Sequence, residues 1–88
     1  MLTDKQLSKL KSLLESEYDW PSQYLFKFIV PKNKVWHLEK LFPQHPLELR
    51  SSKTGKYVSV TVNIELESAD IVIAIYQKAS HIEGLISL

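Results

Sequence analysis

The stretch RSSKTGKY, residues 50–57, gathers the side chains that are best suited to binding an anion. It holds an arginine, two lysines, two serines, a threonine and a glycine within eight positions. A phosphate-binding loop of the P-loop type needs a glycine five residues before its Gly-Lys pair and a serine or threonine directly after the lysine. Arg50 and Tyr57 occupy those two positions here. The segment also joins two expected strands, so no helix N-terminus is available for the anion. The spacing excludes a P-loop.

The same stretch partly resembles an RNA-binding strand, in which a basic residue is followed by aromatic rings on alternate positions. Lys56 and Tyr57 begin such a pattern, but Ser59 and Thr61 stand where further rings would follow. The strand expected at residues 23–30 has no ring on that face either. One tyrosine is a poor stacking platform. We therefore rank nucleic acid behind the other candidate partners.

A tight hairpin turn accounts for the stretch more simply. Thr54-Gly55 lies between two alternating segments, and glycine readily adopts the positive φ that such a turn needs. Lys53 and Lys56 would keep the tip solvated and protect an edge strand from unwanted pairing.

No other motif indicates catalysis or a metal. His37, His45 and His81 have no acid or histidine at the helical spacing that makes a ligand pair. No serine lies in a nucleophile-elbow context. We expect no metal, no cofactor and no enzymatic activity.

Composition indicates one small soluble domain. The chain has 88 residues, of which 44% are apolar and 24% charged, with a net charge of +1 and no cysteine. The near-neutral charge argues against a dedicated nucleic-acid binder, and the missing cysteines exclude disulfides and thiol chemistry. No stretch has the roughly 20 apolar residues of a membrane span, and the start is not a signal peptide. We expect a cytoplasmic protein without a membrane partner.

Helical patterns occur in three segments. Thr3 and Gln6 have capping-box spacing, which predicts a helix up to residue 16 with a leucine stripe at Leu7, Leu10 and Leu14. Asn33 is the expected cap of a second helix that runs to about residue 42. Ser68 predicts the start of a third helix over residues 70–80, with Asp70 favoured in its first turn. The apolar stripe expected for this third helix is Ile71, Ile75, Ala79 and Ile82, with Val72 alongside.

Strand patterns occur in four segments, at residues 23–30, 47–52, 57–65 and 85–88. The third is the clearest, because its valines alternate with polar residues. Strands and helices then follow the order βαββαβ after the first helix. This order predicts an α+β, ferredoxin-like two-layer sandwich with a four-stranded antiparallel sheet and an extra N-terminal helix. We divide the chain into that helix, residues 1–16, and the sandwich, residues 17–88.

The hairpin residues also carry a family resemblance. Ser51-Ser52-Lys53, Gly55, Tyr57 and Ser59-Val60-Thr61 resemble the hairpin of the YbeD-like bacterial proteins, domain of unknown function 493, as do Phe26-Lys27 and Leu13-Leu14-Glu15. The resemblance covers residues 13–88. It implies a ferredoxin-like fold similar in shape to the ACT regulatory domains, which bind amino acids and pair through their sheets. This chain lacks the glycine that ACT domains place between the first strand and first helix.

The polar face of the sheet is the candidate binding surface. Its expected members, with the hairpin, are Lys27, Arg50, Ser52, Lys53, Lys56, Tyr57, Ser59 and Thr61, accompanied by Glu48 and Asn63. They could form a hydrogen-bonding platform for a small anion or a partner sheet. The simpler interpretation, which we favour, is a solvated face on which Glu48 pairs with Lys27 or Arg50.

Two apolar residues fall outside the predicted core. Trp36 lies far from the apolar stripe of its helix, and Ile73 is similarly placed on the third helix. We expect the leucine stripe of the first helix to pack over or beside Trp36, within the chain or from a second subunit. An exposed patch for another protein is the alternative.

Together these observations favour a non-catalytic regulatory or protein-interaction module that forms a homodimer or binds a protein partner. The final strand and the open sheet face are the expected contacts. The alternative is an ACT-like sensor of a small anionic metabolite, and RNA binding comes third.

Overall fold

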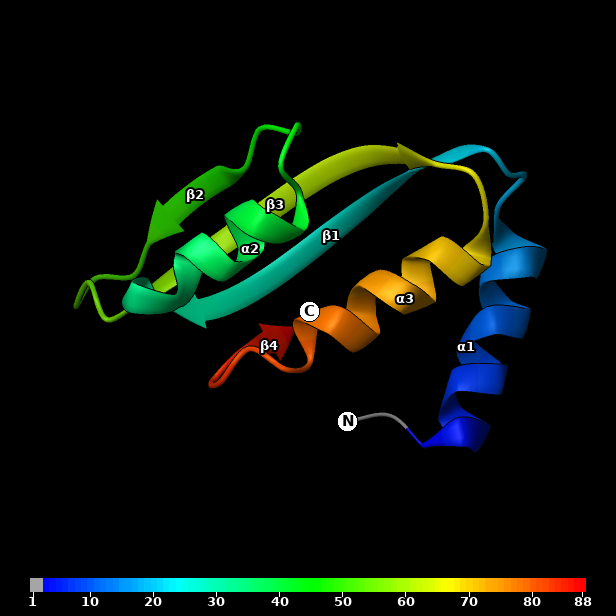
Figure 1. The fold of residues 1–88 in the computed structure, drawn as a ribbon, viewed down its shortest axis with the longest axis horizontal. Helices are drawn as coiled ribbons and strands as arrows, with labels where there is room; N and C mark the ends of the chain where they lie inside the picture. The colour runs from blue at the N-terminus through cyan, green and yellow to red at the C-terminus, as the bar shows by residue number, and fades with distance from the viewer. Residues whose placement is uncertain (1–2) are drawn as a thin grey trace.

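A computed structural model describes residues 3–88 and gives the elements in the expected order (Figure 1). They are α1 (Asp4–Glu17), β1 (Ser22–Pro31), a 3-10 turn η1 (Lys32–Lys34), α2 (Val35–Leu41), β2 (Glu48–Ser51), β3 (Tyr57–Leu66), α3 (Ala69–Ala79) and β4 (Ile86–Ser87). The strands form one antiparallel sheet in the order β2-β3-β1-β4. This is the predicted ferredoxin-like sandwich with an additional helix, α1. Within residues 3–88, no helix is both long and apolar enough to cross a membrane.

Helices α1 and α3 begin at the predicted hydroxyl caps. The Thr3 Oγ1 accepts a hydrogen bond from the Gln6 backbone N–H at 3.2 Å, and the Gln6 Oε1 accepts one from the Thr3 N–H at 2.9 Å. The Ser68 Oγ accepts from the Ile71 N–H at 3.4 Å. These bonds satisfy N–H groups that have no partner inside the helix, which confirms the predicted caps.

The start of α2 differs from the prediction. Asn33 does not cap the helix but lies inside η1, and α2 begins at Val35 without a side-chain cap. The Lys32 N–H donates to the Lys56 carbonyl at 3.0 Å and so ties this segment to the hairpin. The Val35 N–H donates to the Lys32 carbonyl within this turn, so the turn η1 rather than the asparagine side chain leads into α2.

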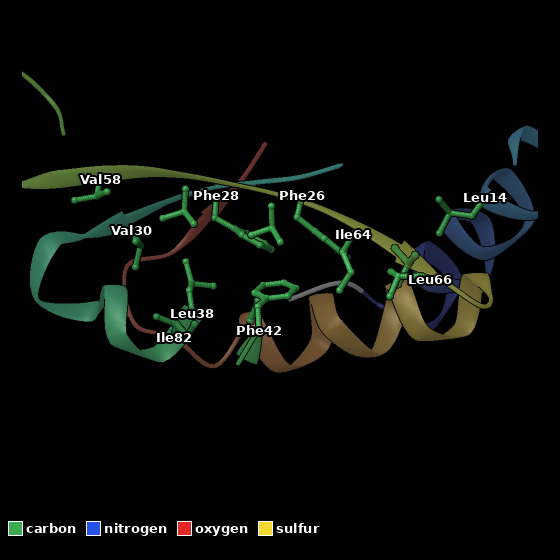
Figure 2. Packing of buried hydrophobic residues seen from close by; sticks show 14 of the residues in the cluster. Leu14, Phe26, Phe28, Val30, Leu38, Phe42, Val58, Ile64, Leu66 and Ile82 are labelled. Atoms are coloured by element: carbon green, nitrogen blue, oxygen red, sulfur yellow. The ribbon is translucent and has the colours of Figure 1, made fainter. Parts of the chain in front are cut away.

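The core lies between the inner face of the sheet and the helices (Figure 2). Along β3 every second side chain from Val58 to Leu66 is buried, as the alternation predicts. Phe26, Phe28 and Val30 of β1 are completely buried beside them. Leu38 and Phe42 approach from the α2 side, and Ile82 follows α3.

The apolar surface of α3 is wider than the predicted stripe. Val72 and Ala79 are fully buried, whereas Ile71, which the stripe placed in the core, is exposed. Ile73, which the stripe left out, is partly buried against the core. Helix α3 packs against both the sheet and α1, so its buried surface is centred on Val72 rather than on Ile71.

The expected docking of α1 over Trp36 within the chain is wrong. Helix α1 packs against the beginning of α3 instead, with Leu14 buried and the Lys11 Nζ 3.0 Å from the Asp70 Oδ1 (Figure 1). Trp36 stays 47% exposed. Its ring stacks on that of His37, with 3.7 Å between centroids, and the Lys40 Nζ lies 4.8 Å from its centre. Neighbours on its own helix therefore cover part of the indole.

Candidate functional site on the outer face of the sheet

The face of the sheet that points away from the helices, here called the outer face, carries most of the predicted site residues. The register pairs Arg50 of β2 with Ser59 of β3, and Thr61 of β3 with Lys27 of β1. Residues paired across neighbouring strands point to the same side. The four side chains therefore lie together on the outer face, opposite the buried valines.

The remaining predicted residues form the hairpin between β2 and β3. The Ser52 Oγ accepts a hydrogen bond from the Tyr57 N–H at 3.3 Å and lies 3.4 Å from the Thr54 Oγ1. Gly55 has a φ of +74° and donates its N–H to the Ser52 carbonyl at 3.0 Å. The predicted turn is confirmed. The Ser52 hydroxyl is occupied by holding this turn closed.

Lysines gather at the hairpin end of the molecule. The bond between the Lys32 N–H and the Lys56 carbonyl places η1, with Lys32 and Lys34, beside the hairpin lysines Lys53 and Lys56. Both hairpin lysines and Lys32 are exposed. This end of the sheet therefore has a local excess of positive charge, although the chain as a whole is close to neutral.

The cross-strand ion pairs expected for Glu48 do not form. Within residues 3–88, the ion pair present is that between Lys11 and Asp70. In the register, Thr61 of β3 lies between Glu48 and Lys27, whose backbones are about 10 Å apart. Arg50 is two residues along the same strand, about 7 Å away. The charges of the outer face thus remain available to another molecule.

An apolar band crosses the half of the outer face formed by β1 and β4. Its members, called the apolar band below, are Leu25, Ile29, Ile86 and Leu88. Ile29 pairs with Ile86 across the strands, and the Leu88 N–H donates to the Lys27 carbonyl at 2.9 Å. Leu25 is 49% exposed, Ile86 53% and Leu88 67%.

The sequence prediction did not include this band. Strand alternation does place Leu25 and Ile29 on the outer face, so half of the signal was present. The final segment, LISL, has a large aliphatic residue on each side, and its register against β1 is needed to tell which residues face outward. The outer face therefore has a polar half on β2 and β3 and a mostly apolar half on β1 and β4, which Lys27 of β1 interrupts.

A groove of about 520 Å³ opens elsewhere, between α1, α3 and the end of β4. Its lining consists of Gln6, Leu7, Leu10, Tyr76, Gln77, Ser80, Leu85, Ser87 and Leu88, so Leu88 borders both the groove and the apolar band. The hydroxyls of Tyr76 and Tyr24 lie 2.9 Å apart at its inner side. Burial, and then the hydrogen bond with Tyr24, raise the pKa of Tyr76 well above its ordinary value. The side chains of the lining are uncharged at neutral pH.

The three histidines lie in different surroundings. His37 stacks on Trp36, His45 lines a small hollow with Glu39, and His81 is exposed just after α3. Within residues 3–88, no three histidine or carboxylate side chains come together as a metal site.

Comparison with known proteins identifies a family without an assigned role. A family model described as "Protein of unknown function (DUF493)" matches residues 15–87. The match spans every strand, α2 and α3, and the last residues of α1. No curated protein and no solved structure matches the chain.

Proposed function

The chain belongs to DUF493, a family of proteins of unknown function, and from its surfaces we propose that it is a non-catalytic, cytoplasmic protein-interaction module with a regulatory role. The binding surface is the outer face of the sheet. The absence of cysteine suits a reducing compartment.

The apolar band is the observation that carries this proposal. Four large aliphatic side chains lie around Lys27 on an open face, and three of them are about half exposed or more. Burying apolar surface is favourable by roughly 25 cal/mol for each Å². A contiguous exposed apolar patch with polar neighbours is typical of a protein interface. Arg50, Ser59 and Thr61 supply the polar neighbours here.

The hydroxyl groups support a non-catalytic role. A nucleophilic serine needs a base within hydrogen-bond reach. Among residues 3–88, the serine and threonine hydroxyls that make hydrogen bonds contact backbone groups or, in the hairpin, one another. None of these bonds joins a hydroxyl to a histidine or carboxylate.

A capture experiment tests the proposal. The double variant Leu25→Asp/Ile86→Asp places charges in the band without touching the core. Leu13→Asp is the matched control, because Leu13 is equally apolar and exposed but lies on α1. Each tagged protein is incubated with an extract of its source cells, and bound proteins are quantified by mass spectrometry.

We expect the wild type and Leu13→Asp to capture the same proteins in similar amounts. The double variant should capture at least about tenfold less of them, since a charge buried at an interface core is strongly unfavourable. Equal capture by the band variant would refute the proposed surface.

Sensing of a small anion is the second candidate function. The lysines of the hairpin and η1 lie side by side at one end of the sheet, which favours an anionic group. A ligand that binds the folded state raises the melting temperature. Thermal-shift measurements with phosphate and carboxylate metabolites, repeated on Lys53→Gln/Lys56→Gln, would support this function if a shift is seen in the wild type alone. A steeply salt-dependent affinity for single-stranded RNA would instead favour nucleic-acid binding.

A further inference from the structure

Two neighbouring rows of outer-face side chains run across the middle of the sheet. The first contains, from β2 to β4, Arg50, Ser59, Ile29 and Ile86. The second contains Glu48, Thr61, Lys27 and Leu88. Each row therefore has a charge on β2, a hydroxyl on β3 and an isoleucine or leucine on β4. The charges on β2 are opposite in sign.

A second copy turned end for end matches these rows. A two-fold axis that runs across the strands between the rows places the first row of one copy over the second row of the other. Arg50 then faces Glu48 of the partner subunit, and Ile86 faces Leu88 of the partner subunit. On β1, Ile29 faces Lys27 of the partner subunit, whose methylene chain can pack on it while the ammonium group stays in water. Because a two-fold interface repeats each contact, both complementary contacts occur twice.

The same axis matches the charges further out. It passes over Val60, and the hairpin glycine Gly55 and Glu65 lie five residues from Val60 in opposite directions along the chain. The lysines Lys53 and Lys56 therefore approach Glu65 of the partner subunit. The opposite arrangement, with strands parallel, would place hairpin on hairpin and bring like charges together.

We propose that the outer face binds a second copy of this chain, face to face and with antiparallel strands, about this axis. The inference rests on the proposed function, in which the outer face is the binding surface, and names its partner. Stacked sheets usually cross at about 30°. That rotation displaces Arg50 and Glu48 less than the hairpin lysines and Glu65, which lie farther from the centre of the face, so Arg50 with Glu48 of the partner subunit is the diagnostic charge contact.

The size of the face indicates a weak dimer. Strands β1 and β3 have ten residues each, but β2 has four and β4 two, so at about 3.3 Å per residue and 4.8 Å per strand the sheet has a projected area of roughly 400 Å². Standard interfaces bury about 800 Å² on each partner. The dimer is therefore expected to dissociate on dilution through the micromolar range.

Sedimentation equilibrium over a wide concentration range tests the arrangement. Arg50→Glu sets two carboxylates against each other and is expected to raise the dimer dissociation constant about tenfold. Glu48→Arg/Arg50→Glu exchanges the two charges and is expected to restore the wild-type value. Lys9→Glu on α1 makes the same change in net charge away from the face, and its dissociation constant should equal that of the wild type.

Three outcomes would overturn the inference. These are a wild type that stays monomeric at millimolar concentration, a dimer unaffected by Arg50→Glu, and an exchange variant no better than Arg50→Glu. Circular dichroism of each variant confirms that it is folded. If the wild type is monomeric but the band variant still loses captured proteins, the outer face binds another protein and only the second copy is excluded.

Discussion

Phe26 and Leu25 are consecutive residues of β1 that point to opposite faces of the sheet. Phe26 is completely buried and contacts the rings of Phe28, Phe42 and Tyr76. Leu25 is also large and apolar, yet half of its surface is exposed. The inner face is explained by the fold, whereas the apolar band on the outer face has no role in it. The comparison teaches that exposed apolar residues beside a completed core indicate a binding surface.

The largest effect should separate these two neighbours. Phe26→Ala removes a fully buried ring and is expected to destabilise the protein by about 3–5 kcal/mol. Leu25→Ala should change the free energy of unfolding by less than about 0.5 kcal/mol. Urea unfolding followed by circular dichroism measures both. A comparable loss for Leu25→Ala would mean that the outer face contributes to the fold.

The same comparison applies to α1. Leu14 is buried against the core and Leu13 beside it is exposed. Leu14→Ala should cost about 2–4 kcal/mol and Leu13→Ala less than about 0.5 kcal/mol. Equal stabilities in urea would show that α1 does not contribute to the core through Leu14.

The two glycines extend the comparison to the turns. Both have positive φ, +74° at Gly55 and +79° at Gly84, so alanine is strained at either position by about 1–2 kcal/mol. A Cβ at Gly55 would meet nothing, but one at Gly84 would lie 2.8 Å from the Pro31 Cγ. Gly84→Ala should therefore lower stability by about 1 kcal/mol more than Gly55→Ala. Thermal unfolding of the two variants measures the difference. A lower melting temperature for Gly55→Ala than for Gly84→Ala would contradict this prediction.

The smallest effect concerns the hydrogen bond between the hydroxyls of Tyr24 and Tyr76. Tyr76→Phe removes the hydrogen bond to Tyr24 and should cost about 1 kcal/mol at neutral pH. Folding raises the pKa of Tyr76, so this residue stabilises the folded state. Its contribution to the free energy of unfolding is fully present below the pKa of tyrosine in the unfolded chain, about 10, and is lost as the pH rises beyond that value.

Urea unfolding at pH 8 and pH 11 measures this dependence. The wild type should lose more stability than Tyr76→Phe between the two values. Parallel loss in both proteins would show that another group titrates instead.

Local patterns predicted most of the fold because they depend on neighbours along the chain. The valines of β3 alternate strictly, and Thr3 and Ser68 cap helices through groups three residues away. The docking of α1 could not be predicted in this way. Its leucine stripe needs an apolar surface but does not specify which one, and Trp36 finds partial cover from His37 and Lys40 on its own helix.

The candidate site was half predicted for a similar reason. Alternation along β1, β2 and β3 places Lys27, Arg50, Ser59 and Thr61 on one face, and their register confirms that they meet. The apolar half depends on β4, a two-residue strand whose outward residues follow only from its pairing with β1. Tertiary pairing, which no short pattern encodes, completes the surface.

Hydroxyl-radical footprinting of the wild type tests most directly whether the outer face binds another protein. Leu25 and Ile86 on that face can be compared with Leu13 and Leu49, which are 57% and 51% exposed and lie elsewhere. Labelling is measured for dilute purified protein and for the same protein in an extract of its source cells. We predict that Leu25 and Ile86 become protected in the extract while Leu13 and Leu49 are labelled equally in both. Equal labelling of all four would contradict the account.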